Sequence, residues 1–182
     1  MRAYEAVEAT GQADLLARAR TGERAAFAEL VERHHAELVR IAFAVTGDLD
    51  AARDAAQLAW IKAWQRLPTV REAGRLRAWL IAIAANEARQ TMRAHRRRRV
   101  REITPAGLNE WAGQNTVTSA DRLDLHAALA RLRPDDRALI AMRYLAGLTT
   151  DEIGAATGLT GSGVRSRLSR MVARLREELD DD

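Results

Sequence analysis

Apolar side chains recur every three or four positions over most of the chain, a spacing that places them on one face of an α-helix. The clearest run precedes Gly47 and comprises Phe27, Leu30, Val31, Leu38, Ile41, Ala42 and Val45. A short helix over residues 14–20 is predicted before it, after a start that we expect to be mobile. No useful run alternates apolar and polar residues with the period of two that a strand requires. The pattern therefore predicts an all-α fold.

Two further helices are predicted in the first half of the chain. Asp48 or Asp50 can cap the first of them, which carries Trp60 and Trp64 one turn apart. The second helix follows a loop at 68–75, and its buried side is formed by Leu76, Trp79, Leu80 and Ile83. Together with the preceding helices, these elements predict one compact helical domain.

The helical pattern is interrupted once, near the middle of the chain. A basic run at 93–101 holds six arginines and no acid, and residues 102–119 then collect proline, glycine, asparagine and threonine. This composition is typical of a linker. We therefore expect two small helical domains joined by a flexible linker, with boundaries at 12–100, 101–120 and 121–179.

The second half contains a helix-turn-helix pattern. Thr149 is followed three residues later by Glu152, the spacing of a capping box at a helix start. Gly158 can adopt the left-handed conformation that ends this helix, and a new helix is predicted to begin at Thr160 or Gly161. The core shared by the two helices is predicted to be Ile153, Leu159 and Val164.

The last helix has an apolar side and a basic side. Its inward stripe is predicted to be Val164, Leu168, Met171 and Leu175. The residues outside this stripe include five candidates for contact with duplex DNA: Ser162, Arg165, Ser166, Arg167 and Arg170. The second helix of a helix-turn-helix enters the major groove with its N-terminal turn, where arginine can bind phosphate or guanine. A solvated basic surface is the alternative for such a face.

A second basic face lies on the helix that follows the 68–75 loop. Its members, at helical spacing, are Asn86, Arg89, Gln90, Arg93 and Arg97. Amide side chains can read base edges, arginines can follow phosphates, and the nearby loop can receive an unstacked base. The helix dipole also favours arginine near a C-terminus, by ~0.3–1 kcal/mol per charge. Six arginines in nine residues exceed what capping requires, so nucleic acid or an acidic protein surface is the better explanation.

The composition of the chain favours some classes of function and excludes others. The 182 residues carry a net charge of +4, and all but one of the basic side chains are arginine, Lys62 being the exception. Arginine suits bidentate contacts with phosphate and guanine, although a GC-rich genome would produce the same bias. The chain has no cysteine, which excludes disulfides, thiolate metal sites and cysteine catalysis. No nucleophile or ligand cluster accompanies the four histidines, so we expect no enzyme activity, cofactor or metal.

Nothing in the chain predicts insertion into a membrane. No apolar run approaches the ~18 residues that a spanning helix requires. The first residues also lack the apolar stretch of a signal peptide. We therefore expect a cytoplasmic protein.

Taken together, four segments resemble a bacterial RNA polymerase sigma factor of the extracytoplasmic-function type. The stretch "ADLLARARTGERAAFAELVERHHAELVRIAFAVTGD" looks like the start of the sigma-2 domain of that family. "DAARDAAQLAWIKAWQRL" is similar to its polymerase-binding helix, and "RLRAWLIAIAANEARQTMRAHRRRR" to its promoter-melting helix. "LRPDDRALIAMRYLAGLTTDEIGAATGLTGSGVRSRLSRM" resembles the sigma-4 domain. The order and spacing of the four segments carry the resemblance.

The resemblance implies roles for particular residues. Asp54 and Gln57 match an Asp-x-x-Gln contact with the clamp-helix coiled coil of the largest polymerase subunits. Asn86 matches a position that reads the minus-ten element in the family. The 68–75 loop matches a loop that holds a flipped base, and the last helix matches the helix that reads the minus-thirty-five element as duplex. The linker would run towards the polymerase active site. The implied partners are core RNA polymerase, promoter DNA as duplex and single strand, and an anti-sigma factor, which holds many relatives inactive.

Two departures from the family pattern bear on these roles. The family usually has glutamate after the glutamine of the polymerase contact, where this chain has Leu58. It also usually begins the recognition helix with Gly-Thr-Val, where this chain has Ser162, Gly163 and Val164. We expect the second departure to alter minus-thirty-five preference. The alternative function, a stand-alone helix-turn-helix regulator, requires a dimer interface or effector pocket, and the sequence has the signature of neither.

Overall fold

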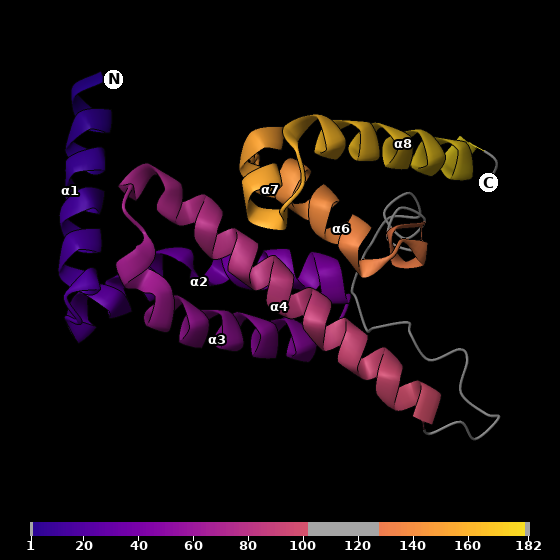
Figure 1. The fold of residues 1–182 in the computed structure, drawn as a ribbon, viewed down its shortest axis with the longest axis horizontal. Coiled ribbons are helices and arrows are strands. Elements are labelled where there is room, and N and C mark those ends of the chain that lie inside the picture. Colours follow the sequence, from indigo (N-terminus) through magenta and orange to yellow (C-terminus); the bar gives the residue numbers. More distant parts are fainter. Residues whose placement is uncertain (1, 102–127, 181–182) are drawn as a thin grey trace.

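The computed structural model describes residues 2–101 and 128–180, and side chains over 11–95 and 128–177. Every element within these ranges is helical, as the sequence predicts (Figure 1). In chain order the elements are α1 Arg2–Arg20, α2 Arg24–Thr46, α3 Leu49–Arg66, η1 Leu67–Thr69, α4 Ala73–Arg101, α6 Pro134–Ile140, η2 Ala141–Leu145, α7 Thr150–Thr157 and α8 Gly161–Asp180. The elements η1 and η2 are short 3-10 and π-helical segments.

Helices α2, α3 and α4 form a bundle, and α1 packs at one end of it (Figure 1). The boundary between α2 and α3 follows from two residues. Gly47 has a φ of 72°, the left-handed conformation that ends a helix, and its N–H donates to the carbonyl of Phe43. The Asp48 side chain then accepts a 2.7 Å hydrogen bond from the N–H of Ala51, so Asp48 rather than Asp50 caps α3.

Three aromatic residues of the bundle meet at the contact between α2 and α3. Phe27 meets the rings of Trp60 and Trp64 edge-on, with centroids 5.6 and 4.8 Å apart. Trp60 is buried, and its indole N–H donates to Nδ1 of His35, 3.2 Å away. Although exposed, His35 therefore has a structural partner.

The first helix is longer than expected. Its predicted start was residue 14, but α1 begins at Arg2. Alanine and glutamate are frequent between these positions, and both favour helix without needing an apolar stripe. The apolar spacing predicted only the part of α1 that packs into the core, through Leu15, Leu16 and Ala19.

The second unit contains α6, η2, α7 and α8. The predicted inward stripe of α8 is confirmed: Val164, Leu168, Met171 and Leu175 are all buried. One member of the predicted helix-turn-helix core is wrong, because Leu159 is 39% exposed. The turn directs the backbone of Leu159 to the core instead, where its N–H donates to the carbonyl of Gly154, and the side chain is left outside.

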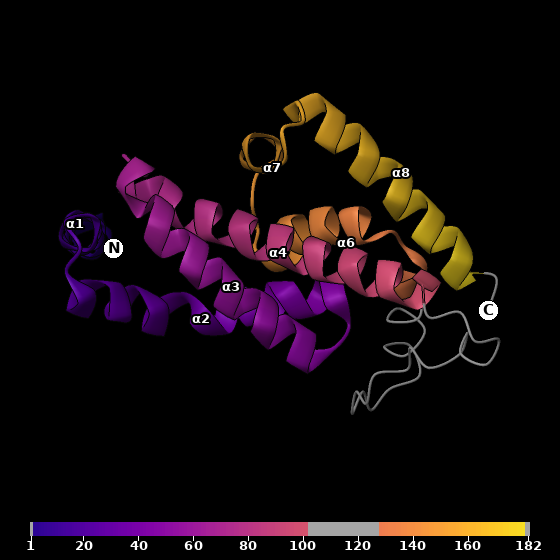
Figure 2. The ribbon, with the colours of Figure 1, turned by 60° about the horizontal axis from the view of Figure 1, so that its bottom comes forward.

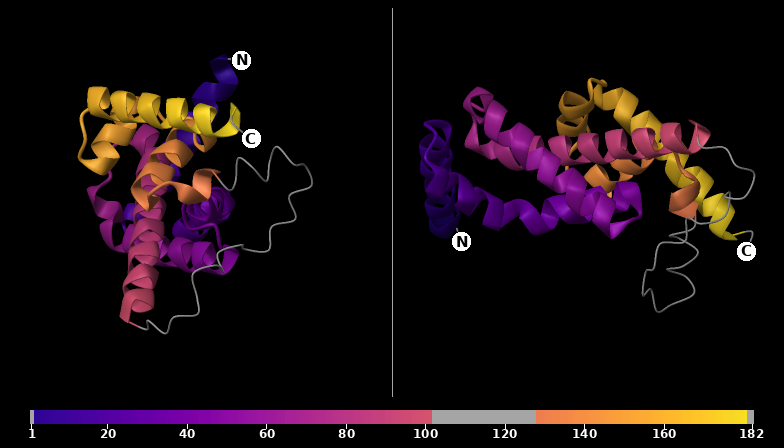
Figure 3. Two further views of the ribbon diagram at one scale, coloured as in Figure 1. Left: turned by 90° about the vertical axis from the view of Figure 1, so that its right-hand side faces the viewer. Right: turned by 90° about the horizontal axis from the view of Figure 1, so that it is seen from below.

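The two units pack against each other through α4 and α2, as the views in Figures 2 and 3 agree. One hydrophobic cluster runs through both, joining Leu38 and Leu80 of the first unit to Leu139 and Met142 of the second. Arg77 of α4 crosses the boundary and donates to the carbonyl of Ala146, 2.8 Å away. The predicted linker lies outside the described residues from 102 onwards, and so does the predicted start of the second domain at 121.

Candidate polymerase and nucleic-acid interfaces

The outward side of α3 carries a continuous stripe that includes both predicted polymerase contacts. Asp54 and Gln57 are exposed one turn apart. Leu58, Ile61 and Trp64 continue the same side of the helix and are 45%, 51% and 38% exposed. We call these five residues the α3 stripe. Exposed apolar groups in line with polar ones are typical of an interface with another protein.

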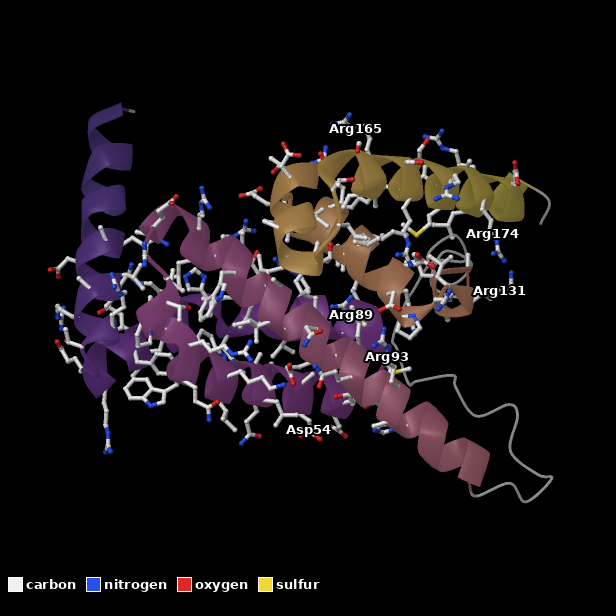
Figure 4. The ribbon with its side chains drawn as sticks, viewed as in Figure 1. Asp54, Arg89, Arg93, Arg131, Arg165 and Arg174 are labelled. Carbon is white, nitrogen blue, oxygen red and sulfur yellow. The ribbon has the colours of Figure 1, made fainter. Side chains whose placement is uncertain are left out.

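The predicted minus-ten residues all lie on α4. Two of them, Arg89 and Arg93, lie where α4 passes α6 (Figure 4). Asn86 and Arg89 are half-buried, whereas Gln90 and Arg93 are exposed. Arg89 donates to Oδ1 of Asn86 over 2.9 Å, so the two side chains act as one hydrogen-bonded group. Arg97 belongs to the same helix but lies beyond the side chains that the structure describes.

An ion pair between a buried glutamate and a half-buried lysine supports this face from beneath. Glu87 is only 3% exposed, and its Oε2 accepts a 2.6 Å hydrogen bond from Nζ of Lys62 on α3. Its other oxygen, Oε1, accepts from Nδ2 of Asn86 over 3.2 Å. Sequence reasoning did not identify Glu87 or Lys62, because the partners lie 25 residues apart and on different helices.

The loop predicted to receive an unstacked base borders a hollow of about 770 Å³. The loop contributes Thr69, Val70 and Arg71 to its lining, and Trp79 of α4 contributes an aromatic ring. The opposite wall comes from α7, including Asp151 and Ala155. In this arrangement the second unit therefore lies across the loop.

The helix-turn-helix has the local structure predicted for it. Thr149 and Glu152 form a complete capping box, whose hydrogen bonds also hold the pKa of Glu152 below its usual value. Gly158 has a φ of 73° and ends α7. Gly154 allows the turn to cross α7 closely, since a Cβ there would lie 2.7 Å from the carbonyl oxygen of Leu159.

The outer side of α8 presents most of the predicted recognition residues to solvent. Ser162, Arg165, Ser166 and Arg170 are exposed, and Arg165 points away from the rest of the molecule in Figure 4. Arg167 differs, because it is half-buried and its Nε donates to Asp136 over 2.7 Å. Thr160 accepts from the N–H of Gly163 over 3.1 Å, which caps the start of α8.

An acidic pair, Asp135 and Asp136, lies between the two basic helices. Asp135 accepts from Arg93 through both carboxylate oxygens at 2.9 Å, and from Arg89 at 3.4 Å. Burial acts to raise the pKa of Asp135, but the hydrogen bond and charge of Arg93, with the charges of Arg89 and Arg167, outweigh it. The pKa of Asp135 is therefore below its usual value, and the group stays ionised near neutral pH.

Comparison with known proteins identifies the family. Residues 30–98 match the family model for Sigma-70 region 2, and residues 122–175 match the model for Sigma-70 region 4. The ECF RNA polymerase sigma factor SigL of Mycobacterium tuberculosis is 34% identical over 166 residues, covering 90% of this chain and 94% of SigL. The RNA polymerase sigma-E factor of Streptomyces coelicolor is 31% identical, covering 87% of this chain and 88% of the relative. The chain is an ECF sigma factor.

Two solved structures have the same fold and are 26% identical in sequence. One is CnrH in complex with the cytosolic domain of CnrY, with a TM-score of 0.68 and coverage of 94% of this chain and 98% of CnrH. The other is the sigma factor RpoE in complex with the anti-sigma factor NepR from Bartonella quintana, with a TM-score of 0.67 and coverage of 86% and 98%. In both cases the likeness extends over two helical units.

Family membership gives the sigma factor its general function, which is to bind core RNA polymerase and direct it to promoters. The described residues contain no group of three or more acids or histidines that could hold a metal ion. Over the same part of the chain, no helix is long and apolar enough to cross a membrane.

Proposed function

We propose that this sigma factor divides its work among three surfaces. The α3 stripe binds the polymerase clamp helices, the α4 face reads the unpaired minus-ten strand, and the outer side of α8 reads the minus-thirty-five duplex. The observation that carries this division is the placement of candidate DNA-binding side chains on two separate helices, one in each unit: amide and arginine groups on α4, and serine and arginine groups on α8. Recognition of one duplex element requires only one such helix. Two separate faces are therefore suited to two promoter elements, one bound as an unpaired strand and the other as a duplex.

The three roles use different chemistry. Unpaired bases can stack on side chains and form edge hydrogen bonds, and this stabilises the melted strand against re-pairing. Duplex recognition needs a helix that enters the major groove, and α8 offers Arg165 and Ser162 in its first turns. The sigma factor itself is expected to catalyse nothing and to act in the cytoplasm with polymerase.

The division of roles can be tested with two single variants in reconstituted holoenzyme. Asn86→Ala is expected to reduce promoter opening several-fold, measured by permanganate reactivity, and to leave binding to a duplex minus-thirty-five fragment unchanged. Arg165→Ala should have the reverse effect, because it removes a duplex contact. Arg176→Ala, an exposed arginine further along α8, serves as the matched control. Equal losses of opening and duplex binding in both variants would contradict the division.

Control by an anti-sigma factor is also proposed for this chain. CnrH and RpoE, which share its fold, were solved with the cytosolic domain of CnrY and with the anti-sigma factor NepR. A partner of this kind would compete with core polymerase for the sigma factor. A competition assay with purified core polymerase and the candidate partner measures this directly.

A further inference from the structure

The side-chain amide of Asn86 is held in one orientation by its neighbours. Its Nδ2 donates to Oε1 of Glu87 over 3.2 Å, and its Oδ1 accepts from Arg89 over 2.9 Å. The other oxygen of Glu87 is taken by Lys62, 2.6 Å away. An amide has two donor hydrogens and two acceptor lone pairs, so Asn86 retains one of each for a ligand.

We infer that Glu87 and Lys62 are positioning residues of the minus-ten site. This inference rests on the proposed role of Asn86 in reading a base. Turning the amide over would exchange donor and acceptor, and base edges are distinguished by the order of those groups. Glu87 prevents this exchange because an ionised carboxylate only accepts hydrogen bonds, and therefore always faces the N–H side of Asn86.

Lys62 makes this arrangement possible. A carboxylate as buried as Glu87 needs a charged or hydrogen-bonding partner to offset its loss of hydration. Lys62 supplies it from α3, and it is the only lysine in the sequence. The base-reading side chain is thereby connected, through one buried carboxylate, to the helix that carries the α3 stripe.

The test begins with Glu87→Gln. The new side chain has a single oxygen, which Lys62 takes, so its NH2 faces Nδ2 of Asn86. Two donors then oppose each other, and turning the amide over would instead point its NH2 at the donor of Arg89, so Asn86 loses its single fixed orientation. We expect Glu87→Gln to abolish base preference at the position that Asn86 reads, as Asn86→Ala does. Transcription from promoters that differ at single minus-ten bases measures this preference and cancels changes in polymerase affinity.

A double variant separates positioning from simple loss of structure. In Lys62→Met with Glu87→Gln, the glutamine oxygen is released from lysine and can accept from Nδ2 of Asn86. Base preference should then return towards that of the unmodified protein, even where thermal stability does not. The side-chain amide resonances of Asn86, assigned with Asn86→Ala, report its orientation without DNA. They should shift in Glu87→Gln and return in the double variant.

The outcomes distinguish the positioning role of Glu87 and Lys62 from the base-reading role of Asn86. Amide resonances that do not respond to Glu87→Gln would overturn the positioning role. Resonances that shift and return while base preference stays constant would support positioning and contradict the role of Asn86 in base reading.

A second, independent observation concerns the acidic pair Asp135 and Asp136. Asp135 binds Arg89 and Arg93 of α4, and Asp136 binds Arg167 of α8. Figure 4 shows Arg89 and Arg93 between α4 and α6. Two adjacent carboxylates therefore engage arginines from both helices that are proposed to bind DNA. Carboxylate and phosphate compete for the same guanidinium geometry.

The geometry points to the acidic pair as an internal substitute for DNA phosphate that keeps the free sigma factor closed. This proposal also rests on the proposed DNA-binding faces. While the pair is engaged, α4 faces the second unit instead of a promoter strand, and α7 lies across the base-receiving loop. Closure is imperfect, since Nε of Arg89 is buried without a hydrogen-bond partner. A buried donor without a partner destabilises the closed arrangement, which favours release when polymerase and DNA bind.

The test uses the free full-length chain. Asp135→Asn with Asp136→Asn is expected to increase the radius of gyration in small-angle scattering. It should also raise affinity for a single-stranded oligonucleotide of a mapped minus-ten element at least threefold. The matched control is Glu29→Gln with Asp50→Asn, which changes the net charge equally but affects acids paired only within their own helices.

Two results would bear against the proposals in different ways. A radius of gyration no larger than that of the control would overturn the closed state. An increased radius with no gain in DNA binding would support the closed state and contradict the assigned DNA faces.

Discussion

Ile61→Asp is expected to reduce the affinity of the sigma factor for core polymerase by about tenfold or more, with little effect on its fold. Ile61 lies at the centre of the α3 stripe and is 51% exposed, so the change removes no buried packing. The substitution places a negative charge within the apolar part of the proposed interface. Asp54, in the same stripe, already carries a negative charge. The loss of a central interface side chain that acts as a hot spot costs ~2 kcal/mol or more, which corresponds to more than a tenfold change in affinity.

Leu49→Asp provides the matched control for this prediction. Leu49 is on the same helix and is 46% exposed, but it lies twelve residues before Ile61. At 3.6 residues per turn, this places it about a third of a turn from Ile61, outside the α3 stripe. Titration of core polymerase with labelled sigma factor measures both affinities. If the two variants bind equally well, the interface does not follow the stripe.

Gly154→Ala is expected to destabilise the second unit by about 1–3 kcal/mol and to weaken minus-thirty-five binding. The new Cβ would lie 2.7 Å from the carbonyl oxygen of Leu159, closer than real contacts allow. The obstructing atom belongs to the backbone, so relief requires movement of the turn between α7 and α8. Overpacking of this kind costs typically ~1–3 kcal/mol. The displaced turn also changes how α8 meets the groove.

Gly74→Ala should have the opposite effect on stability. Gly74 is also a helical glycine, but nothing lies within 4 Å of the place that a Cβ would take, so the methyl group enters open space. Alanine favours helix over glycine by up to about 1 kcal/mol. Thermal unfolding of the two variants measures the contrast. A loss of stability in Gly74→Ala, or none in Gly154→Ala, would contradict the packing argument.

The local features of the helix-turn-helix could be read from sequence because each depends on a few neighbouring residues. The capping box of Thr149 and Glu152 and the left-handed Gly158 were predicted and are confirmed. Leu159 was assigned to the core and is exposed. An apolar residue after a helix-ending glycine usually packs inward, but here the close crossing at Gly154 brings the backbone of the turn against α7 instead.

The candidate sites, too, could be predicted from the sequence only where helical spacing or family resemblance identified the residues. Asp54, Gln57 and the faces of α4 and α8 were found by helical spacing and by resemblance to the family. Leu58 was noted only as a departure from the family pattern, and its alignment with Ile61 and Trp64 depends on which side of α3 the core covers. The roles of all these residues remain predictions for the experiments above.

The sequence by itself determined the all-α fold, most helix ends and the two basic faces, because these depend on spacing and capping within one helix. Only the tertiary structure decided which arginines of the two basic faces pair with acids. Arg89 and Asp135 are 46 residues apart and Arg167 and Asp136 are 31 apart, and no local pattern links such pairs. The same is true of Lys62 and Glu87, whose contact exists because α3 packs on α4. An ion pair forms where the packing of whole helices brings two charges together, and that packing is a property of the complete fold.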